Sequence, residues 1–192
     1  MSTSILYLHG FNSSPQSDKV QKTQQYFLQH YPEINFICPQ IVSTPKGAIV
    51  QLTEIIKSKP NERWFLIGSS LGGYFSTYLA ETYHQNAVLI NPAVKPYELL
   101  NDYIGEQLNP YTNERYQVTE AFINDLKVLE QNQLAEKNNY FVMLQTGDEV
   151  LDYQQAVEKY KNKQLVIQQG GDHSFVDYEK MLPKIAEFFQ LD

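Results

Sequence analysis

Short apolar runs recur along the chain, and segments with helical spacing separate them. Six runs rich in β-branched and aromatic residues are Ile5–Leu8, Ile34–Cys38, Trp64–Ile67, Ala87–Ile90, Tyr140–Leu144 and Leu165–Ile167. Such continuous runs are typical of strands buried on both faces of a parallel sheet. The helical segments are Lys19–His30, Ala48–Lys57, Leu71–His84, Tyr153–Tyr160 and Tyr178–Phe189. This alternation predicts an α/β fold, a mostly parallel sheet with helices on both faces.

One segment, Lys95–Lys137, interrupts the alternation and contains no strand-like run. It holds a strong turn signal at Asn109–Asn113, and we predict short helices near Tyr97–Tyr103 and Thr119–Leu129. Its four tyrosines are Tyr97, Tyr103, Tyr111 and Tyr116. Because a long insertion after a strand is often an active-site lid, we predict a single domain over 1–192 with 95–137 as a lid-like insertion.

The segment Gly68-Ser69-Ser70-Leu71-Gly72 has the Gly-x-Ser-x-Gly pattern of a nucleophile elbow. An apolar strand leads into it and an amphipathic helix leaves it, which is the strand–turn–helix setting the motif requires. Glycines two positions from the serine relieve clashes with the adjacent strand and helix. We predict that Ser70 is a nucleophile.

A serine hydroxyl needs a general base, and the chain has four histidines to supply it. His30 and His84 fall near the ends of predicted helices, where a solvent-facing cap is the simpler interpretation. His173 differs because it lies in a glycine-opened loop between the last strand and the last helix. We predict that His173 is the base.

The acid that orients this histidine should follow the preceding strand, where Asp148, Glu149 and Asp152 are close together. Asp148 stands closest to the strand end, so we prefer it. Glu149 would then be a solvated loop carboxylate, and Asp152 would cap the next helix. The chain order serine, aspartate, histidine is the order stated for α/β-hydrolases.

Acyl transfer also requires two backbone N–H groups for the oxyanion. One should belong to Leu71, the residue after the nucleophile. The other should come from the loop after the first strand, which reads His9-Gly10-Phe11-Asn12, and Phe11 is the candidate. His9 and Gly10 would shape this turn and take no part in proton transfer.

These motifs resemble those of the small bacterial YqiA-like esterases of the α/β-hydrolase superfamily. The matching segments are His9–Pro15, Gly68–Tyr74, Asn91–Val94, Gln145–Tyr153 and Gly170–Phe175, so the likeness spans nearly the whole chain. The resemblance implies a Ser–Asp–His esterase that uses no metal and no organic cofactor. It also implies small-molecule substrates, acyl esters or acyl-CoA thioesters.

The composition and charge of the chain limit its possible partners and its cellular compartment. A formal net charge of -7 argues against a nucleic-acid partner, because such binding depends on Lys and Arg. The lone cysteine, Cys38, cannot form an intramolecular disulfide, and we expect it to be a buried strand residue. The sequence shows neither a signal peptide nor a membrane span, so we expect a cytoplasmic protein.

We therefore predict a serine hydrolase that cleaves carboxylic esters or thioesters through an acyl-enzyme. One alternative is a non-catalytic α/β-hydrolase scaffold that binds a ligand or partner, since a fold does not fix a function. A serine peptidase or an acyltransferase would use the same residues. The sequence leaves open the acyl group, the leaving group and the oligomeric state.

Overall fold

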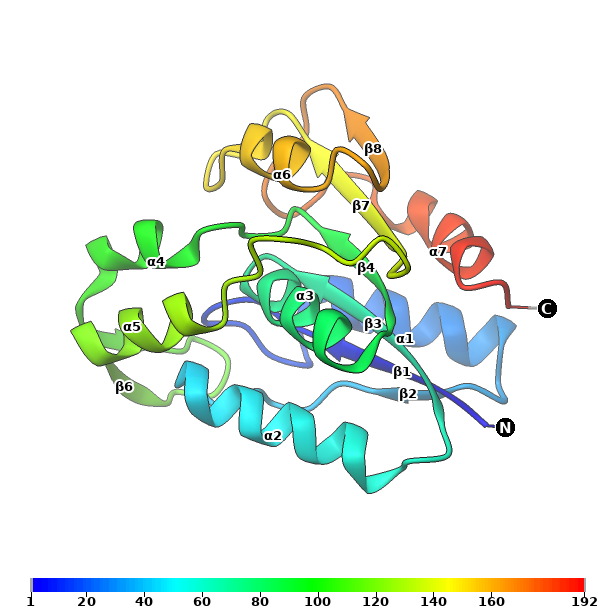
Figure 1. Cartoon of the computed structure of the whole chain (residues 1–192), viewed down its shortest axis with the longest axis horizontal. Coiled ribbons are helices and arrows are strands. Elements are labelled where there is room, and N and C mark those ends of the chain that lie inside the picture. The colour runs from blue at the N-terminus through cyan, green and yellow to red at the C-terminus, as the bar shows by residue number, and fades with distance from the viewer. Residues whose placement is uncertain (1, 192) are drawn as a thin grey trace.

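Six parallel strands form the central sheet of the structure, a computed structural model that describes residues 2–191 (Figure 1). The strands are β1 (Thr3–Leu8), β2 (Asn35–Ile37), β3 (Arg63–Ser69), β4 (Asn86–Ile90), β7 (Tyr140–Gln145) and β8 (Gln164–Gln168). Their order is β2-β1-β3-β4-β7-β8, and every neighbouring pair is parallel. Each predicted apolar run therefore lies in or overlaps a strand of one sheet.

Helices cover both faces of this sheet. The main helices are α1 (Asp18–His30), α2 (Pro45–Ser58), α3 (Leu71–Tyr83), α6 (Tyr153–Lys159) and α7 (Leu182–Phe188), the last preceded by the 3-10 helix η2 (Tyr178–Met181). Alternate strand residues belong to two separate cores. One core joins the sheet to α1 and α7, and the other joins it to α2, α3 and α6. This arrangement is the predicted α/β fold.

The insertion contains more structure than the sequence predicts. Helices occur where they are expected, in α4 (Pro96–Leu99) with the 3-10 helix η1 (Leu100–Tyr103), and in α5 (Glu120–Val128). Between them, β5 (Gly105–Leu108) and β6 (Arg115–Val118) form an antiparallel hairpin. The prediction of no strand in this segment was wrong, because these short strands are largely exposed and lack a continuous apolar run.

The prediction for Cys38 also needs correction. The residue lies one position beyond β2 and is only half-buried, so it is not a buried strand residue. Burial nevertheless raises the pKa of its thiol to about 12, which leaves it protonated at neutral pH. Within residues 2–191, no helix is both long enough and apolar enough to cross a membrane.

The carboxyl ends of the parallel strands meet at one edge of the sheet, and the insertion lies beyond that edge, on the left of Figure 1. The chain passes from β1 outward to β2 and then returns to β3 on the other side of β1. Open α/β sheets bind ligands at such a switch point. The loops that follow β1 and β3 carry the predicted site residues Phe11 and Ser70.

Candidate active site

Ser70 occupies a sharp turn between β3 and α3, with φ 55° and ψ -121°. A Cβ at Gly68 would overlap the Gly72 carbonyl oxygen in the helix, and a Cβ at Gly72 would overlap the Leu8 carbonyl oxygen in β1. Any larger residue at either position would push the helix away from the sheet. The two glycines therefore permit the close approach that the turn requires, as the motif predicts.

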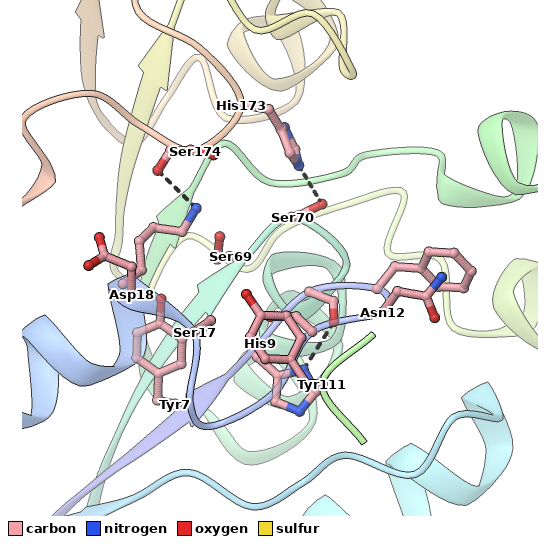
Figure 2. A pocket seen from close by; sticks show the side chains of 14 residues that line it. Tyr7, His9, Asn12, Ser17, Asp18, Ser69, Ser70, Tyr111, His173 and Ser174 are labelled. Carbon is pink, nitrogen blue, oxygen red and sulfur yellow. Dashed lines mark hydrogen bonds between the residues drawn. The ribbon is translucent and has the colours of Figure 1, made fainter. Parts of the chain in front are cut away.

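His173 stands between Ser70 and Asp148. Its Nε2 lies 3.0 Å from Ser70 Oγ, and its Nδ1 lies 2.8 Å from Asp148 Oδ2. A dashed line in Figure 2 marks the contact with Ser70. A carboxylate only accepts hydrogen bonds, so Nδ1 carries the proton and Nε2 is free to accept from the serine hydroxyl. The structure thus brings together the three side chains that the sequence singles out.

Asp148 is held in place from two sides. Its side chain is 2% exposed, and its Oδ1 accepts hydrogen bonds from the backbone N–H groups of Val150 and Leu151. Burial alone would raise the pKa of this carboxyl. The hydrogen bonds from His173, Leu151 and Val150 outweigh burial and leave the pKa below its ordinary value. Asp148 is therefore ionised at neutral pH.

The two neighbouring carboxylates have other partners. Asp152 caps α6 by accepting from the Gln154 N–H at 2.9 Å, as expected from its position. Glu149 was expected to be merely solvated, but its carboxylate accepts the backbone N–H of His173 at 3.0 Å. This contact fixes the histidine loop without touching the imidazole ring.

Two buried polar residues that sequence reasoning missed also hold this loop. Asn91, at the end of β4, donates to the carbonyl oxygens of Asp172 and His173. Gln145, at the end of β7, accepts from the N–H groups of Asp172 and Val176. The available signal was a polar residue directly after a fully apolar run. A buried polar side chain at a strand end usually forms hydrogen bonds with nearby backbone N–H and C=O groups.

The two predicted oxyanion donors lie on either side of Ser70. Within the described residues, neither the Phe11 nor the Leu71 backbone N–H donates a hydrogen bond, so both remain available to a substrate oxygen. The loop after β1 passes close to the elbow, because a Cβ at Gly10 would stand 3.2 Å from Ser70 Cβ. This closeness brings the loop that carries Phe11 alongside the serine.

His9 shapes that loop. Its Nε2 accepts the Ile41 N–H at 3.1 Å and its Nδ1 lies 3.0 Å from the Gly10 carbonyl oxygen, so the neutral ring satisfies both contacts. Burial lowers the pKa of His9, with the hydrogen bond to Gly10 acting against the shift. A neutral histidine bonded to backbone on both sides fits a structural role.

An apolar pocket of about 170 Å³ opens beside the serine. Ser70, His173 and the two predicted oxyanion donors, Phe11 and Leu71, contribute to its wall. The rest of the wall is apolar and includes Ala93, Leu99, Leu100, Tyr103, Val150 and Leu151. Three of these side chains come from α4 and η1 of the insertion, so the insertion helps to enclose the pocket.

A second, polar cleft of about 310 Å³ is drawn in Figure 2. It shares Phe11, Ser70 and His173 with the apolar pocket. Hydroxyl groups line much of it, from Ser13, Ser17, Ser69, Tyr111 and Ser174. Lys19 and Asp18, at the start of α1, add charges. Across residues 2–191, no group of three His, Cys, Asp or Glu side chains is arranged to hold a metal ion.

Comparison with known proteins places the chain in a family. The model of an uncharacterised protein family, UPF0227, matches residues 4–190. The chain belongs to the UPF0227 family. This membership confirms the family resemblance drawn from the motifs. A UPF0227 relative, the protein YcfP of Escherichia coli O9:H4 (strain HS), is 24% identical over 189 residues, which cover 96% of this chain and 97% of that protein.

Solved structures identify the fold of this UPF0227 chain as that of the α/β-hydrolases. Mouse alpha/beta hydrolase domain-containing protein 10 matches with a TM-score of 0.76 and 15% identity, covering 99% of this chain and 90% of that one. Est1E from Butyrivibrio proteoclasticus, in a structure with ferulic acid bound, matches with a TM-score of 0.74 and 12% identity over 98% and 88% of the two chains.

Proposed function

We propose that this protein is a serine esterase that hydrolyses carboxylic esters, and thioesters by the same route, through an acyl-enzyme. The observation that carries the proposal is the position of His173, 3.0 Å from Ser70 Oγ and 2.8 Å from Asp148 Oδ2. A nucleophile, a base and an orienting acid in contact are the requirements of acyl transfer by serine.

In the first half of the reaction, Ser70 Oγ attacks the acyl carbon while its proton passes to His173 Nε2. The carbonyl oxygen becomes an oxyanion, which accepts hydrogen bonds from the Phe11 and Leu71 N–H groups. His173 then gives the proton to the leaving oxygen or sulfur, and the bond from that atom to the acyl carbon breaks. Asp148 stabilises the imidazolium in between.

In the second half, a water molecule attacks the acyl-enzyme and loses its proton to His173. The bond between the acyl carbon and Ser70 Oγ breaks, and His173 returns the proton to the serine. The products are the free acid and the alcohol or thiol, so no cofactor is consumed.

The apolar pocket supports a short acyl group. At about 30 Å³ for a group the size of a water molecule or a methylene, its volume of about 170 Å³ holds about five or six carbon atoms. The structural neighbour Est1E, with ferulic acid bound, also has this fold. The rival interpretation, a scaffold that binds without catalysis, gives no reason for the contacts among Ser70, His173 and Asp148.

Hydrolysis of aryl butyrates tests the proposal. Ser70→Ala should lower kcat by about 10⁴-fold or more while leaving thermal unfolding nearly unchanged, because only the nucleophile is lost. Ser69→Ala is the matched control, since the hydrogen bonds of the His173 ring within the described residues go to Asp148 and Ser70 and none goes to Ser69, and it should retain most of the activity. Equal activity of Ser70→Ala and wild type would refute the esterase proposal.

A further inference from the structure

The polar cleft and the apolar pocket meet at the reacting groups, because Phe11, Ser70 and His173 line both of them. Leu71, one of the two proposed oxyanion donors, lines only the apolar pocket, whereas Phe11 lines both. Ser174, which follows the base in sequence, lines only the cleft. His173 can protonate a leaving group in either place, so the other wall residues decide: the apolar side chains suit the acyl chain, and the hydroxyl groups and Lys19 of the cleft suit a polar leaving group.

Lys19 contributes a positively charged ammonium group to the wall of this cleft. Its Nζ donates one hydrogen bond, to the Ser174 carbonyl oxygen at 3.0 Å. An ammonium group has three donors, so two remain for a ligand. Within the part of the chain that the structure describes, Lys19 has no carboxylate within 4.0 Å, while the neighbouring Asp18 pairs with Lys22 at 2.9 Å.

Other groups in the cleft wall also lack partners. The Tyr7 hydroxyl is fully buried and has no hydrogen-bond partner within residues 2–191. The Ser17 side chain precedes α1 without capping its N–H groups. Buried polar groups in proteins are nearly always satisfied by protein, water or ligand. The accessible hydroxyl groups of the wall, Ser17 among them, therefore suit a ligand with several hydrogen-bond acceptors, whereas the Tyr7 hydroxyl lies behind the surface.

We propose that the substrate's leaving group carries an anionic group, a carboxylate or a phosphate, and that Lys19 binds it. This inference rests on the proposed esterase function and names the substrate class of that same site. A short apolar acyl chain fills the pocket by Tyr103, and the polar alcohol or thiol extends past Ser174 to Lys19.

The electrostatics of Lys19 agree with this assignment. Burial lowers the pKa of its ammonium group, while the carboxylates of Asp172, Asp148 and Asp18 act in the opposite direction. A bound anion would favour the charged form of the lysine and offset the cost of its burial. The cleft wall holds one lysine and one aspartate, and the aspartate, Asp18, is already paired with Lys22.

Matched aryl butyrates test the proposal. The esters are meta-carboxyphenyl butyrate, meta-phosphonooxyphenyl butyrate and the uncharged meta-carbamoylphenyl butyrate, which share one acyl group. The wild type should show a kcat/KM about tenfold or more higher for an anionic ester than for the amide, because a hydrogen bond to a charged group is worth this much. The carboxylate and phosphate arms tell which anion the cleft prefers.

The variant Lys19→Met should bring the ratio of the two kcat/KM values close to one. Lys57→Met is the matched control, because Lys57 is an exposed lysine in the last turn of α2, and the ratio should stay at the wild-type value. Added salt should reduce the wild-type ratio, which tests the claim without any variant.

Two results would overturn the proposal. One is a wild-type ratio near one for both anionic esters. The other is an equal loss by Lys19→Met on charged and uncharged esters, which would mean that Lys19 only supports the Ser174 backbone beside His173. Failure of the esterase function itself is distinguishable, because Ser70→Ala would then match the wild type on all three esters.

Discussion

The backbone of Ser70 has a positive φ of 55°, which L-residues rarely adopt. Strain of this kind costs about 1–3 kcal/mol and persists only where the surroundings impose it. Here the Ser70 N–H donates to the Ile90 carbonyl oxygen at 3.1 Å, and the Ser70 carbonyl oxygen accepts the Ala93 N–H at 3.1 Å. The strand beside β3 thus holds the serine in the position from which its hydroxyl reaches His173.

Asp148→Asn tests the orienting acid. An amide in place of the carboxylate can donate to the imidazole, and this favours the tautomer in which Nε2 carries the proton and cannot accept from Ser70. We expect kcat on an aryl butyrate to fall by about 10⁴-fold. Steady-state kinetics measures this effect, with circular dichroism to check folding.

The neighbouring carboxylates provide the controls for this substitution. Asp152→Asn should leave kcat within a few-fold of wild type, because Asp152 only caps α6. Glu149→Gln should also have a small effect, since an amide oxygen can still accept the His173 N–H. A large loss at Asp152 with wild-type behaviour at Asp148 would transfer the role of the acid.

The sequence allowed the three central residues to be predicted because each follows a short apolar run typical of a strand, in the chain order of an α/β-hydrolase. Asn91, Gln145 and Lys19 could not be predicted in the same way. Asn91 and Gln145 act on the loop that carries His173, and only the packing of three strand ends brings them there. Lys19 belongs to α1, and its nearness to Ser174 depends on how that helix sits on the sheet.

At the scale of elements, the β5–β6 hairpin supports the oxyanion loop. Tyr116 donates to Asn12 Oδ1 at 2.8 Å, and Asn109 Nδ2 donates to the Ser13 carbonyl oxygen at 3.0 Å. The Phe11 ring packs edge-on against Tyr103 and Tyr116. The turn was predicted from Asn109–Asn113, but the strands were not, because they alternate more and less exposed positions over only four residues and lack the continuous apolar run by which the other strands were recognised. That the insertion acts as a lid stays a prediction.

Truncation of two tyrosines of the insertion tests how it contributes to substrate binding. Tyr103 lines the apolar pocket, whereas Tyr111 lines the polar cleft. Tyr103→Ala should raise KM more for butyrate than for acetate esters, because each methylene buried is worth about 0.8 kcal/mol at most. The measurement is KM for a series of acetate, propionate and butyrate esters with one leaving group.

Tyr111→Ala is the contrasting variant. It should change KM by a similar factor at every acyl length, because it faces the leaving group in this account. If both truncations raise KM equally for acetate and butyrate, the tyrosines only stabilise the insertion. The assignment of the apolar pocket to the acyl chain would then be wrong, while the proposed roles of Ser70, Asp148 and His173 would stand.

Across the whole molecule, the continuous apolar runs predicted the parallel sheet because strands buried on both faces have no polar side. In β3, Phe65 and Ile67 face α1 and α7, while Trp64 and Leu66 face α2 and α3. The strand order could not be read from these runs, since they are alike in composition. That order places the loops after β1 and β3 side by side, so the site depends on it.

The most direct test of the central claim is covalent labelling of the intact protein with a fluorophosphonate, followed by mass spectrometry. We expect one adduct per chain, located by peptide mapping at Ser70. Labelling should be strongly slowed in Asp148→Asn and His173→Ala and absent in Ser70→Ala. An adduct on another residue, or labelling of Ser70→Ala at the wild-type rate, would contradict the assignment of Ser70 as the nucleophile.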